Sequence, residues 1–504
     1  MKEIVIMYNI DNRKKAHVLI VILLTLSVFV IGSGMTPPKL TTWGKAYTTG
    51  DYEYPYFTVE TTDSHFLIGG YLLYPDREFL IVKSDADDGN VLWKYTYGGS
   101  GHEYPGSGSN YYNAYRSGNG TFTFGGGSNS FSYKNWFRGI DTVFDFLLFN
   151  ISDDDGDVNW ARAYRGDDND YLSAIQLINT YYVLGGFTES FSTSQTSFLV
   201  IKTVASNGNV SWVNVYDSGG SDNLRALVED GYGNYVLGGN SNSSGNYDMV
   251  VVKVDDTDGN IDSTLNKDYG GSGDDYIQFL LRTPSDNGYL FGGSTYSYDY
   301  PAGSGRNCIL VKTDSNGNVG SAFPGTFANV YDINARSKDR FHTAILVPGG
   351  YIVGGITNPG AGSTEIDGFL MKIDLTGDLV WTKIVTHDGD PGDNVDYIHG
   401  LDSTADGSII IANSSQNGFP ASTKNNFVLI KADSNGEVGG CSVCRNLLPS
   451  ETLTVTDITD TISVSTSGMR RSLKDVSGDS NFFKVITNDI TKNTPPISVD
   501  DLCP

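Results

Sequence analysis

A double glycine that ends a short apolar run recurs along the chain, and it constrains the fold more than any other feature. The six copies end at Gly70, Gly126, Gly186, Gly239, Gly293 and Gly355, and an altered seventh copy reads Ile410-Ile411-Ala412-Asn413. The first glycines, from Gly69 to Gly354, are 53 to 62 residues apart. This period is typical of propeller blades and is longer than most helical repeats.

Three further segments follow each double glycine in a fixed order. A second apolar run comes first and usually ends in Lys, at Lys83, Lys202, Lys253, Lys312, Lys372 and Lys431. A turn containing Gly comes next, such as Asp88-Gly89-Asn90, and then a strand that often opens with Trp, as at Trp212. Asn-Gly and Asp-Gly between apolar runs indicate tight hairpins, because these residues tolerate positive φ. A further strand is expected before the run that ends in the double glycine. Each repeat is therefore predicted to form one antiparallel sheet of four short strands.

The number of strands predicts how the repeats close. The first three strands of the repeat occur seven times, the last set ending at Lys431. A strand of the fourth type, Trp43–Tyr47, precedes all of them, whereas the seventh set runs into Gly439-Gly440-Cys441 without its own fourth strand. We therefore predict an all-β, seven-bladed β-propeller of four-stranded antiparallel blades, closed by the N-terminal strand. Closure of this kind leaves few exposed sheet edges.

The repeat unit resembles known propeller families. Tyr182–Gly186, Phe198–Lys202 and Asn207–Trp212 together resemble the secreted β-propeller repeats common in bacterial and archaeal surface proteins. The unit is also similar to kelch repeats, which share a double glycine followed by a spaced Trp, and Asp85–Trp93 is similar to a segment of quinoprotein repeats. The resemblance extends from Trp43 to about Val438 and implies the fold. It implies little about activity, because propellers host many unrelated functions.

The N-terminus predicts export. Arg13, Lys14 and Lys15 precede an apolar run from Val18 to Ile31, which is followed by small residues up to Gly34. A basic flank, an apolar stretch and small residues form a secretory signal, and the run is short for a membrane span. We expect a signal peptide at 1–34, a propeller at 35–440 and a cysteine-containing β-rich appendage at 441–504. The alternative is an uncleaved N-terminal anchor, the one arrangement that would tie the protein to a membrane.

The charge of the chain bears on its partners. It carries 34 basic and 59 acidic residues, a formal net charge of −25. Such a surface repels phosphate backbones and anionic lipid, so we expect no nucleic-acid partner. For a secreted or cell-surface propeller, the expected partners are proteins or carbohydrates.

An acidic residue recurs just before the first strand of each repeat. The seven positions are Glu53, Glu103, Asp170, Asp222, Asp275, Asp339 and Asp396, and several are followed directly by Tyr. Because the first strand of a blade is innermost, we expect these acids at one mouth of the central channel. Each carboxylate could accept backbone N–H bonds and fix its loop. Alternatively, the acids together could attract a cation or a cationic ligand.

Two of the acidic turns offer the oxygen ligands that Ca²⁺ prefers. They contain Asp85 and Asp87 in the first repeat, and Asp153, Asp155 and Asp157 in the second. The equivalent turns Asn207-Gly208 and Asn316-Gly317 contain few carboxylates. The geometry of the turn explains all seven copies, whereas calcium explains two at most. We therefore predict no cofactor and keep calcium as the weaker interpretation.

The cysteines and the Asn-x-Ser/Thr triplets are sites of possible covalent modification. In an exported chain, Cys503 is expected to form a disulfide with Cys441 or Cys444, with a Cys441–Cys444 bond as the fallback. Asn119, Asn209, Asn242 and Asn413 are candidate glycosylation sites, and Asn150 is a fifth triplet at the end of a strand.

Two classes of function are compatible with these features. The favoured one is an exported, non-enzymatic surface or matrix protein that binds protein or carbohydrate. The alternative is an exported polysaccharide hydrolase or lyase that uses carboxylates at the channel mouth. No catalytic residue is predicted, because neither a metal-type His pair nor a nucleophile or phosphate-loop motif occurs.

Overall fold

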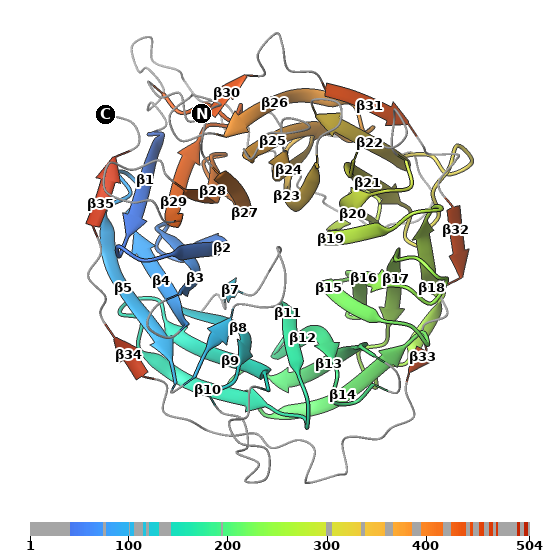
Figure 1. Cartoon of the computed structure of the whole chain (residues 1–504), viewed down its shortest axis with the longest axis horizontal. Coiled ribbons are helices and arrows are strands. Elements are labelled where there is room, and N and C mark those ends of the chain that lie inside the picture. The colour runs from blue at the N-terminus through green and yellow to red at the C-terminus, as the bar shows by residue number, and fades with distance from the viewer. Residues whose placement is uncertain are drawn as a thin grey trace, which may run out of the picture. The chain divides into compact units, whose positions relative to one another are not determined.

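Seven antiparallel sheets are arranged in a ring (Figure 1). Six of them contain four or more consecutive strands of one repeat, and the seventh combines β27, β28 and β29 with the N-terminal strand β1. The structure is a computed structural model, and it describes residues 41–439 except 74–76, 100, 105–113, 117–119, 131–142, 193–194, 299–304, 334–337, 358–365, 386–394 and 417–424. It also describes the backbone of six short strands between 444 and 501. The predicted seven-bladed propeller of four-stranded blades is confirmed.

Within each blade, the strands follow one another from the innermost outward. Blade 1 consists of β2 (Glu53–Glu60), β3 (Phe66–Leu72), β4 (Glu78–Ser84) and β5 (Val91–Gly98). Blade 2 consists of an inner strand in two parts, β6 (Glu103–Tyr104) and β7 (Ala114–Arg116), followed by β8 (Thr121–Ser128), β9 (Asp145–Ser152) and β10 (Val158–Tyr164). Blade 3 consists of β11 (Asp170–Ile178), β12 (Tyr181–Thr188), β13 (Ser197–Val204) and β14 (Val210–Asp217). Blades 4 and 5 consist of β15 (Asp222–Glu229), β16 (Tyr235–Ser241), β17 (Asp248–Val254) and β18 (Ile261–Gly270); and β19 (Asp275–Thr283), β20 (Gly288–Thr295), β21 (Asn307–Thr313) and β22 (Phe327–Ile333). Blades 6 and 7 consist of β23 (Arg340–Val347), β24 (Gly350–Thr357), β25 (Asp367–Asp374) and β26 (Leu379–Val385); and β27 (Val395–Ser403), β28 (Ile409–Gln416), β29 (Asn425–Ala432) and β1 (Trp43–Thr48).

The N-terminal strand closes the ring, as predicted. β1 pairs antiparallel with β29, with Trp43 opposite Lys431 and Tyr47 opposite Phe427. The first strand of the propeller therefore completes the last blade. This pairing joins the two ends of the repeat region, so no blade is left with three strands among those that the structure describes.

The described part of the C-terminal tail consists of short strands that pair with the blades of the ring. Its strands are distributed around the outer side of the ring, and each extends one blade as a fifth strand (Figure 1). They are β30 (Cys444–Asn446) on blade 6, β31 (Leu453–Asp457) on blade 5, β32 (Ser463–Thr466) on blade 4, β33 (Arg470–Arg471) on blade 3, β34 (Thr491–Asn493) on blade 1 and β35 (Ser498–Asp501) on blade 7. Successive tail strands thus pair with the blades in descending order, from blade 6 to blade 1 and then blade 7. Each pairs with the outer edge of its blade, which the closure of the ring leaves without a neighbouring strand. Covering such edges protects a sheet from pairing with other chains.

A β-bulge in the inner strand explains the double glycine. In blade 3, Leu172 pairs with Gly186 and Ala174 with Gly185, so that Ser173 is the extra residue. A Cβ on Gly186 would lie 2.0 Å from the carbonyl oxygen of Tyr171, a contact that no side chain can make. The bulge therefore brings the inner strand so close to its neighbour that only glycine fits there.

The blades are joined by apolar contacts. Among the described residues, seven clusters of buried apolar side chains occur, each shared by two adjacent blades. One of them combines Phe198 and Val200 of blade 3 with Leu237 and Val252 of blade 4. Continuous apolar runs such as Phe198–Ile201 are thus buried on both faces, which is the pattern of strands that are covered by neighbouring sheets.

A tyrosine hydroxyl joins most blades to the next. The tyrosine four residues after the Trp position donates to the carbonyl oxygen of the turn glycine in the following blade. The six bonds are Tyr47 to Gly89, Tyr97 to Gly156, Tyr164 to Gly208, Tyr216 to Gly259, Tyr269 to Gly317 and Tyr331 to Gly377, at 2.6 to 3.2 Å. Val385 takes the equivalent place in blade 6, so the contact between blades 6 and 7 lacks this hydrogen bond.

Buried lysines reinforce the side of the ring that carries these turns. Lys83, 2% exposed, bonds to Asp63 in the first hairpin of its own blade and to Asp153 in blade 2. Lys202 reaches Asp256 of blade 4 in a similar way. The Lys that ends the third strand is therefore a structural residue. No helix of membrane-spanning length and hydropathy occurs within the described residues.

Candidate functional site

The seven recurring acids are buried where the inner strands begin. Their exposed fractions are 0 or 1%. Asp222 accepts a bond from Ser218 N at 2.7 Å, and Asp275 accepts from Gly271 N at 2.9 Å and from Ser297 Oγ at 2.6 Å. Asp339 accepts from Ile333 N at 2.6 Å. These contacts hold the loops that lead into the inner strands, and they favour the structural interpretation of the acids.

The remaining recurring acids have similar partners. Glu53 accepts from Thr49 N at 2.6 Å, and Glu103 accepts from Ser128 Oγ at 2.9 Å. Asp170 accepts from Ser190 Oγ at 2.9 Å, and Asp396 accepts from Asn413 Nδ2 at 3.2 Å. All of these partners belong to the same blade as the acid or to the loop that precedes it.

Burial governs the protonation of these acids. It raises the pKa of Glu53 and of Glu103 to about 7, against the opposing effect of their hydrogen bonds. It raises the pKa of Asp275 to about 6. Several of these groups are therefore neutral in mildly acidic solution, and none of the seven presents an exposed carboxylate to the channel.

The side chains that follow each acid form a polar and aromatic stripe on the inner strands. In a strand, alternate residues lie on the same face. The first and third residues after the acid, such as Asn223 and Arg225 after Asp222, therefore share one face of the inner strand. The acid and the second residue after it, such as Leu224, lie on the other face, toward the apolar clusters. We call these pairs the inner-strand stripe. Its members are Tyr54 and Tyr56, Tyr171 and Ser173, Asn223 and Arg225, Tyr276 and Gln278, Arg340 and His342, and Tyr397 and His399.

The burial pattern sets the first members of the stripe apart from the core, whereas the second members Ser173, His342 and His399 are buried. The first member of every pair is half-buried, whereas the residue between the two members, such as Leu224 or Ile277, is fully buried. The second member is the bulge residue of its strand in all six pairs. Bulges commonly redirect a side chain next to a binding site. Figure 1 shows the inner strands β2, β11, β15, β19, β23 and β27 nearest the centre of the ring.

Four tyrosines of the stripe each lie beside a second ring. Tyr54 stacks on Tyr71 at 5.0 Å between ring centroids, and Tyr171 lies 5.1 Å from Phe187. Tyr276 lies 5.5 Å from Tyr247, and Tyr397 stacks on His399 at 5.7 Å. These are half-buried rings at the start of an inner strand rather than core residues. A tyrosine side chain, which has an apolar ring and a polar hydroxyl group, suits ligands that combine apolar faces with hydroxyl groups.

The stripe is densest where blades 6, 7 and 1 meet. His342 of blade 6 stacks on His399 of blade 7 at 5.7 Å, and His399 lies 5.2 Å from Tyr56 of blade 1. Tyr56 in turn lies 5.7 Å from Tyr71. We call Tyr54, Tyr56, Tyr71, Arg340, His342, Tyr397 and His399 the aromatic cluster. It connects three blades through side chains of their inner strands.

Both histidines of the aromatic cluster are uncharged. His342 is buried, and its Nδ1 lies 2.7 Å from the carbonyl oxygen of Ile398 in the next blade. Burial and, to a smaller extent, the charge of Arg340 lower the pKa of His342 well below its usual value and that of His399 to about 3.

The acidic turns considered for calcium act as hydrogen-bond caps. Asp85 Oδ1 accepts from Asp87 N at 2.8 Å, and Asp155 Oδ1 accepts from Asp157 N at 3.1 Å. Asp153 is buried, and its carboxylate pairs with Lys83 at 2.9 Å. Within the described part of the chain, no group of three or more His, Cys, Asp or Glu side chains is arranged to hold a metal ion.

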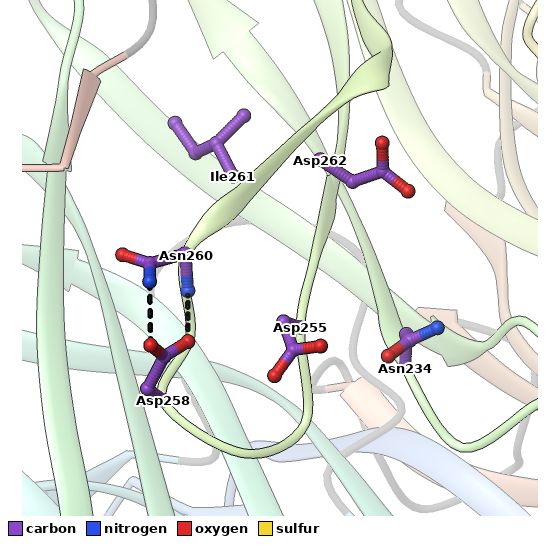
Figure 2. Close-up of a pocket in the computed structure, with 6 residues that line it drawn as sticks. All are labelled: Asn234, Asp255, Asp258, Asn260, Ile261 and Asp262. Atoms are coloured by element: carbon purple, nitrogen blue, oxygen red, sulfur yellow. Dashed lines mark hydrogen bonds between the residues drawn. The ribbon is translucent and has the colours of Figure 1, made fainter.

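The equivalent turn of blade 4, which is not among the turns considered for calcium, borders a pocket of about 400 Å³. Figure 2 shows its lining residues, Asn234, Asp255, Asp258, Asn260, Ile261 and Asp262. The dashed lines mark bonds to Asp258 from the backbone and side-chain nitrogens of Asn260. Asp255 similarly accepts from Thr257 N, and Asp262 accepts from Thr264 N. These acids are committed to turn geometry, so the pocket has no arrangement that favours a particular ligand.

The predicted modification sites have different environments. Asn209 is exposed and Asn242 is half-buried, whereas Asn413 is 2% exposed and bonds to Asp396, so the folded protein gives no access to it. Asn150 is buried as well, at 5% exposure. Asn119, Cys441, Cys503 and the segment 1–34 lie outside the described residues, as does the side chain of Cys444.

The inner-strand stripe is not among the features that the sequence predicts, although a signal for it exists. The repeats reveal the recurring acids and the tyrosine after several of them. Aligning the repeats on the acid shows a second position three residues later that is polar or aromatic in six blades, from Tyr56 to His399. Sequence reasoning misses this position because the bulge adds one residue to the inner strand. The extra residue breaks the regular alternation of apolar and polar residues by which a strand is recognised.

Comparisons with known proteins add little to this picture. No protein-family model and no curated protein matches the chain. A solved structure of quinohemoprotein alcohol dehydrogenase from Comamonas testosteroni is similar at 10% identity and a TM-score of 0.38, covering 79% of this chain and 76% of that one. Sqt1 from Chaetomium thermophilum is similar at 10% identity and a TM-score of 0.38, covering 77% and 97%. No ligand or activity is transferred from either protein.

Proposed function

We propose that this protein is an exported surface or matrix propeller that binds carbohydrate, without chemical conversion, on the inner-strand stripe. The observation that carries the proposal is the set of half-buried tyrosines at the start of the inner strands, each beside a second ring. Sugar rings present apolar C–H faces and a rim of hydroxyl groups. Aromatic faces with nearby hydrogen-bonding tips complement both parts.

The surroundings of the tyrosines support a binding role. Arg225, Gln278 and His399 stand at the equivalent bulge positions of their inner strands. A few convergent polar groups beside aromatic walls are typical of ligand sites. The basic and apolar N-terminal segment, together with the resemblance of the repeats to secreted propellers, supports export.

The alternative of a polysaccharide hydrolase or lyase that uses the recurring acids has less support. Glycoside cleavage needs two carboxyl groups open to the substrate and to water. The seven acids are at most 1% exposed and bond to their own loops. These acids therefore stabilise the blades and the loops that precede them, and they do not form an exposed reaction site.

A glycan array tests the proposal directly. The full chain, the variants Tyr54→Ala and Tyr397→Ala, and the control Tyr232→Ala are applied to the same array. Tyr232 is 75% exposed in the turn between β15 and β16, at the opposite end of an inner strand. We expect binding by the parent and by Tyr232→Ala, and a loss of roughly tenfold or more with each stripe variant. Absence of glycan binding, or binding that both stripe variants retain, would contradict the proposal.

Export has a separate readout. The N-terminal residue of the protein recovered outside the producing cells is expected to follow Gly34. Retention of the intact N-terminus on protein found inside the cells would contradict export.

A further inference from the structure

The outer edge of blade 2 differs from the other six outer edges. Each of the other blades has a fifth strand from the C-terminal tail, whereas β10 pairs with β9 alone within the described residues. An outer strand without a neighbour presents a row of backbone N–H and C=O groups that can pair with a further strand. The edge of β10 is therefore a candidate interaction surface.

The tail strands all pair with the same part of an outer strand. β30 is antiparallel to Lys383–Val385 at the end of β26, and β34 is antiparallel to Thr96–Gly98 at the end of β5. The strands β31, β32, β33 and β35 occupy the equivalent place on β22, β18, β14 and β1. The equivalent place on blade 2 is the C-terminal end of β10, at Arg162–Tyr164.

The spacing of the tail strands allows one more strand at blade 2. Strands on adjacent blades are separated by three to six residues, in the linkers 447–452, 458–462, 467–469 and 494–497. By contrast, the 19 residues 472–490, which lie outside the described residues, separate β33 on blade 3 from β34 on blade 1. Two linkers of ordinary length would use about 6 to 12 of these residues and leave about 7 to 13. Since an extended chain covers up to about 3.5 Å per residue, this length suffices to cross both blade boundaries and to form a strand between them.

The sequence of this segment contains a strand signal. Phe482-Phe483-Lys484-Val485-Ile486-Thr487 is rich in aromatic and β-branched residues, which favour strands. Gly478–Asn481 precedes this run and Asn488-Asp489 follows it, and such residues are typical of the turns that bound a strand. Phe482 and Phe483 are also the only aromatic residues after Gly440. The signal thus falls within the part of the tail that connects blade 3 with blade 1.

We infer that the outer edge of β10 binds residues 481–487 of the same chain, which pair with it antiparallel as the fifth strand of blade 2. β33 and β34 tether this segment on both sides, on the two blades that flank blade 2. Its effective concentration at β10 is therefore on the order of millimolar. A second copy of the chain, or an extended peptide of another protein, competes poorly at far lower concentration. The inference does not depend on carbohydrate binding.

Hydrogen exchange of the full chain tests this pairing. In the parent, the outward-facing amides at the C-terminal end of β10 should exchange within about tenfold of the rate of those in β18 and β22, which pair with β32 and β31. Val485→Pro and Ile486→Pro are the test variants, because proline has no N–H and adjacent strand residues direct their N–H groups to opposite sides. At least one of the two should raise the exchange rate of the β10 amides by about tenfold or more. Val476→Pro is the matched control, since it places the same substitution outside 481–487, and it should leave these amides unchanged.

The same measurement at several protein concentrations identifies the occupant of the edge. Protection of the β10 amides that is independent of concentration and is lost in one of the two test variants supports the inference. Exchange in the parent more than about tenfold faster than in β18 and β22, or protection that both test variants retain, would overturn it. Protection that rises with protein concentration, together with a dimer in size-exclusion chromatography, would assign the edge to a second copy and would overturn it as well.

Discussion

Removing one tyrosine hydroxyl should weaken the contact between two blades by a measurable amount. Tyr216 at the end of β14 donates to Gly259 O in blade 4 at 2.7 Å, and its side chain is fully buried. Tyr216→Phe keeps the ring in the apolar cluster between blades 3 and 4 and deletes only the donor. Gly259 O then loses its partner in a buried place, which costs about 1 to 3 kcal/mol of unfolding free energy.

Urea unfolding followed by tryptophan fluorescence measures this loss. Tyr232→Phe is the matched control, because Tyr232 is 75% exposed and its hydroxyl should contribute less than about 0.5 kcal/mol. If Tyr216→Phe unfolds at the same urea concentration as Tyr232→Phe, the hydroxyl does not stabilise the contact between the blades. The reasoning would then also fail for the five equivalent tyrosines.

Further predictions address the acids, the tail and the contact between blades 6 and 7. Burial raises the pKa of Glu103 from 4.5 to about 7, so between these pH values the folded state holds a proton that the unfolded state has lost. The free energy of unfolding should therefore fall as pH rises from about 4.5 to 7. Glu103→Gln should reduce this pH dependence in thermal melts, and an unchanged pH dependence would contradict the prediction. Asp275→Ala should cost about 1 to 3 kcal/mol in urea unfolding by leaving Gly271 N and Ser297 Oγ without their acceptor, and a parent-like midpoint would refute the structural role. Deleting residues 441–504 should leave the ring folded but associating through its outer strands, as size-exclusion chromatography would detect; a monomeric product would argue against edge protection. Hydrogen exchange should be fastest at the contact between blades 6 and 7, where Val385 replaces the tyrosine, and uniform exchange across all seven contacts would contradict this.

The fold could be predicted because each repeat contains its own constraints. The double glycine reflects the close approach of a bulged inner strand, as the contact between Gly186 and Tyr171 shows. The unpaired strand at Trp43 and the missing strand after Lys431 could be matched by counting alone. These features are local in sequence or repeat many times, so one chain suffices to reveal them.

The pairing of the tail strands with the blades and the aromatic cluster could not be predicted in this way. The tail strands are two to five residues long, and each depends on an edge supplied by a distant blade. A segment such as Thr491–Asn493 has no apolar pattern of its own, because its pairing partner β5 provides the order. The aromatic cluster joins Tyr56 to His399, which are far apart in sequence and meet only because the ring closes.

The decisive measurement is a crystal structure of the full chain with an oligosaccharide that binds in solution. Carbohydrate binding on the inner strands requires a sugar ring stacked on Tyr397 or Tyr54. A sugar bound on the outer strands, or at the turns that include Asp255 and Asp258, with the aromatic cluster left uncovered, would contradict the proposed site.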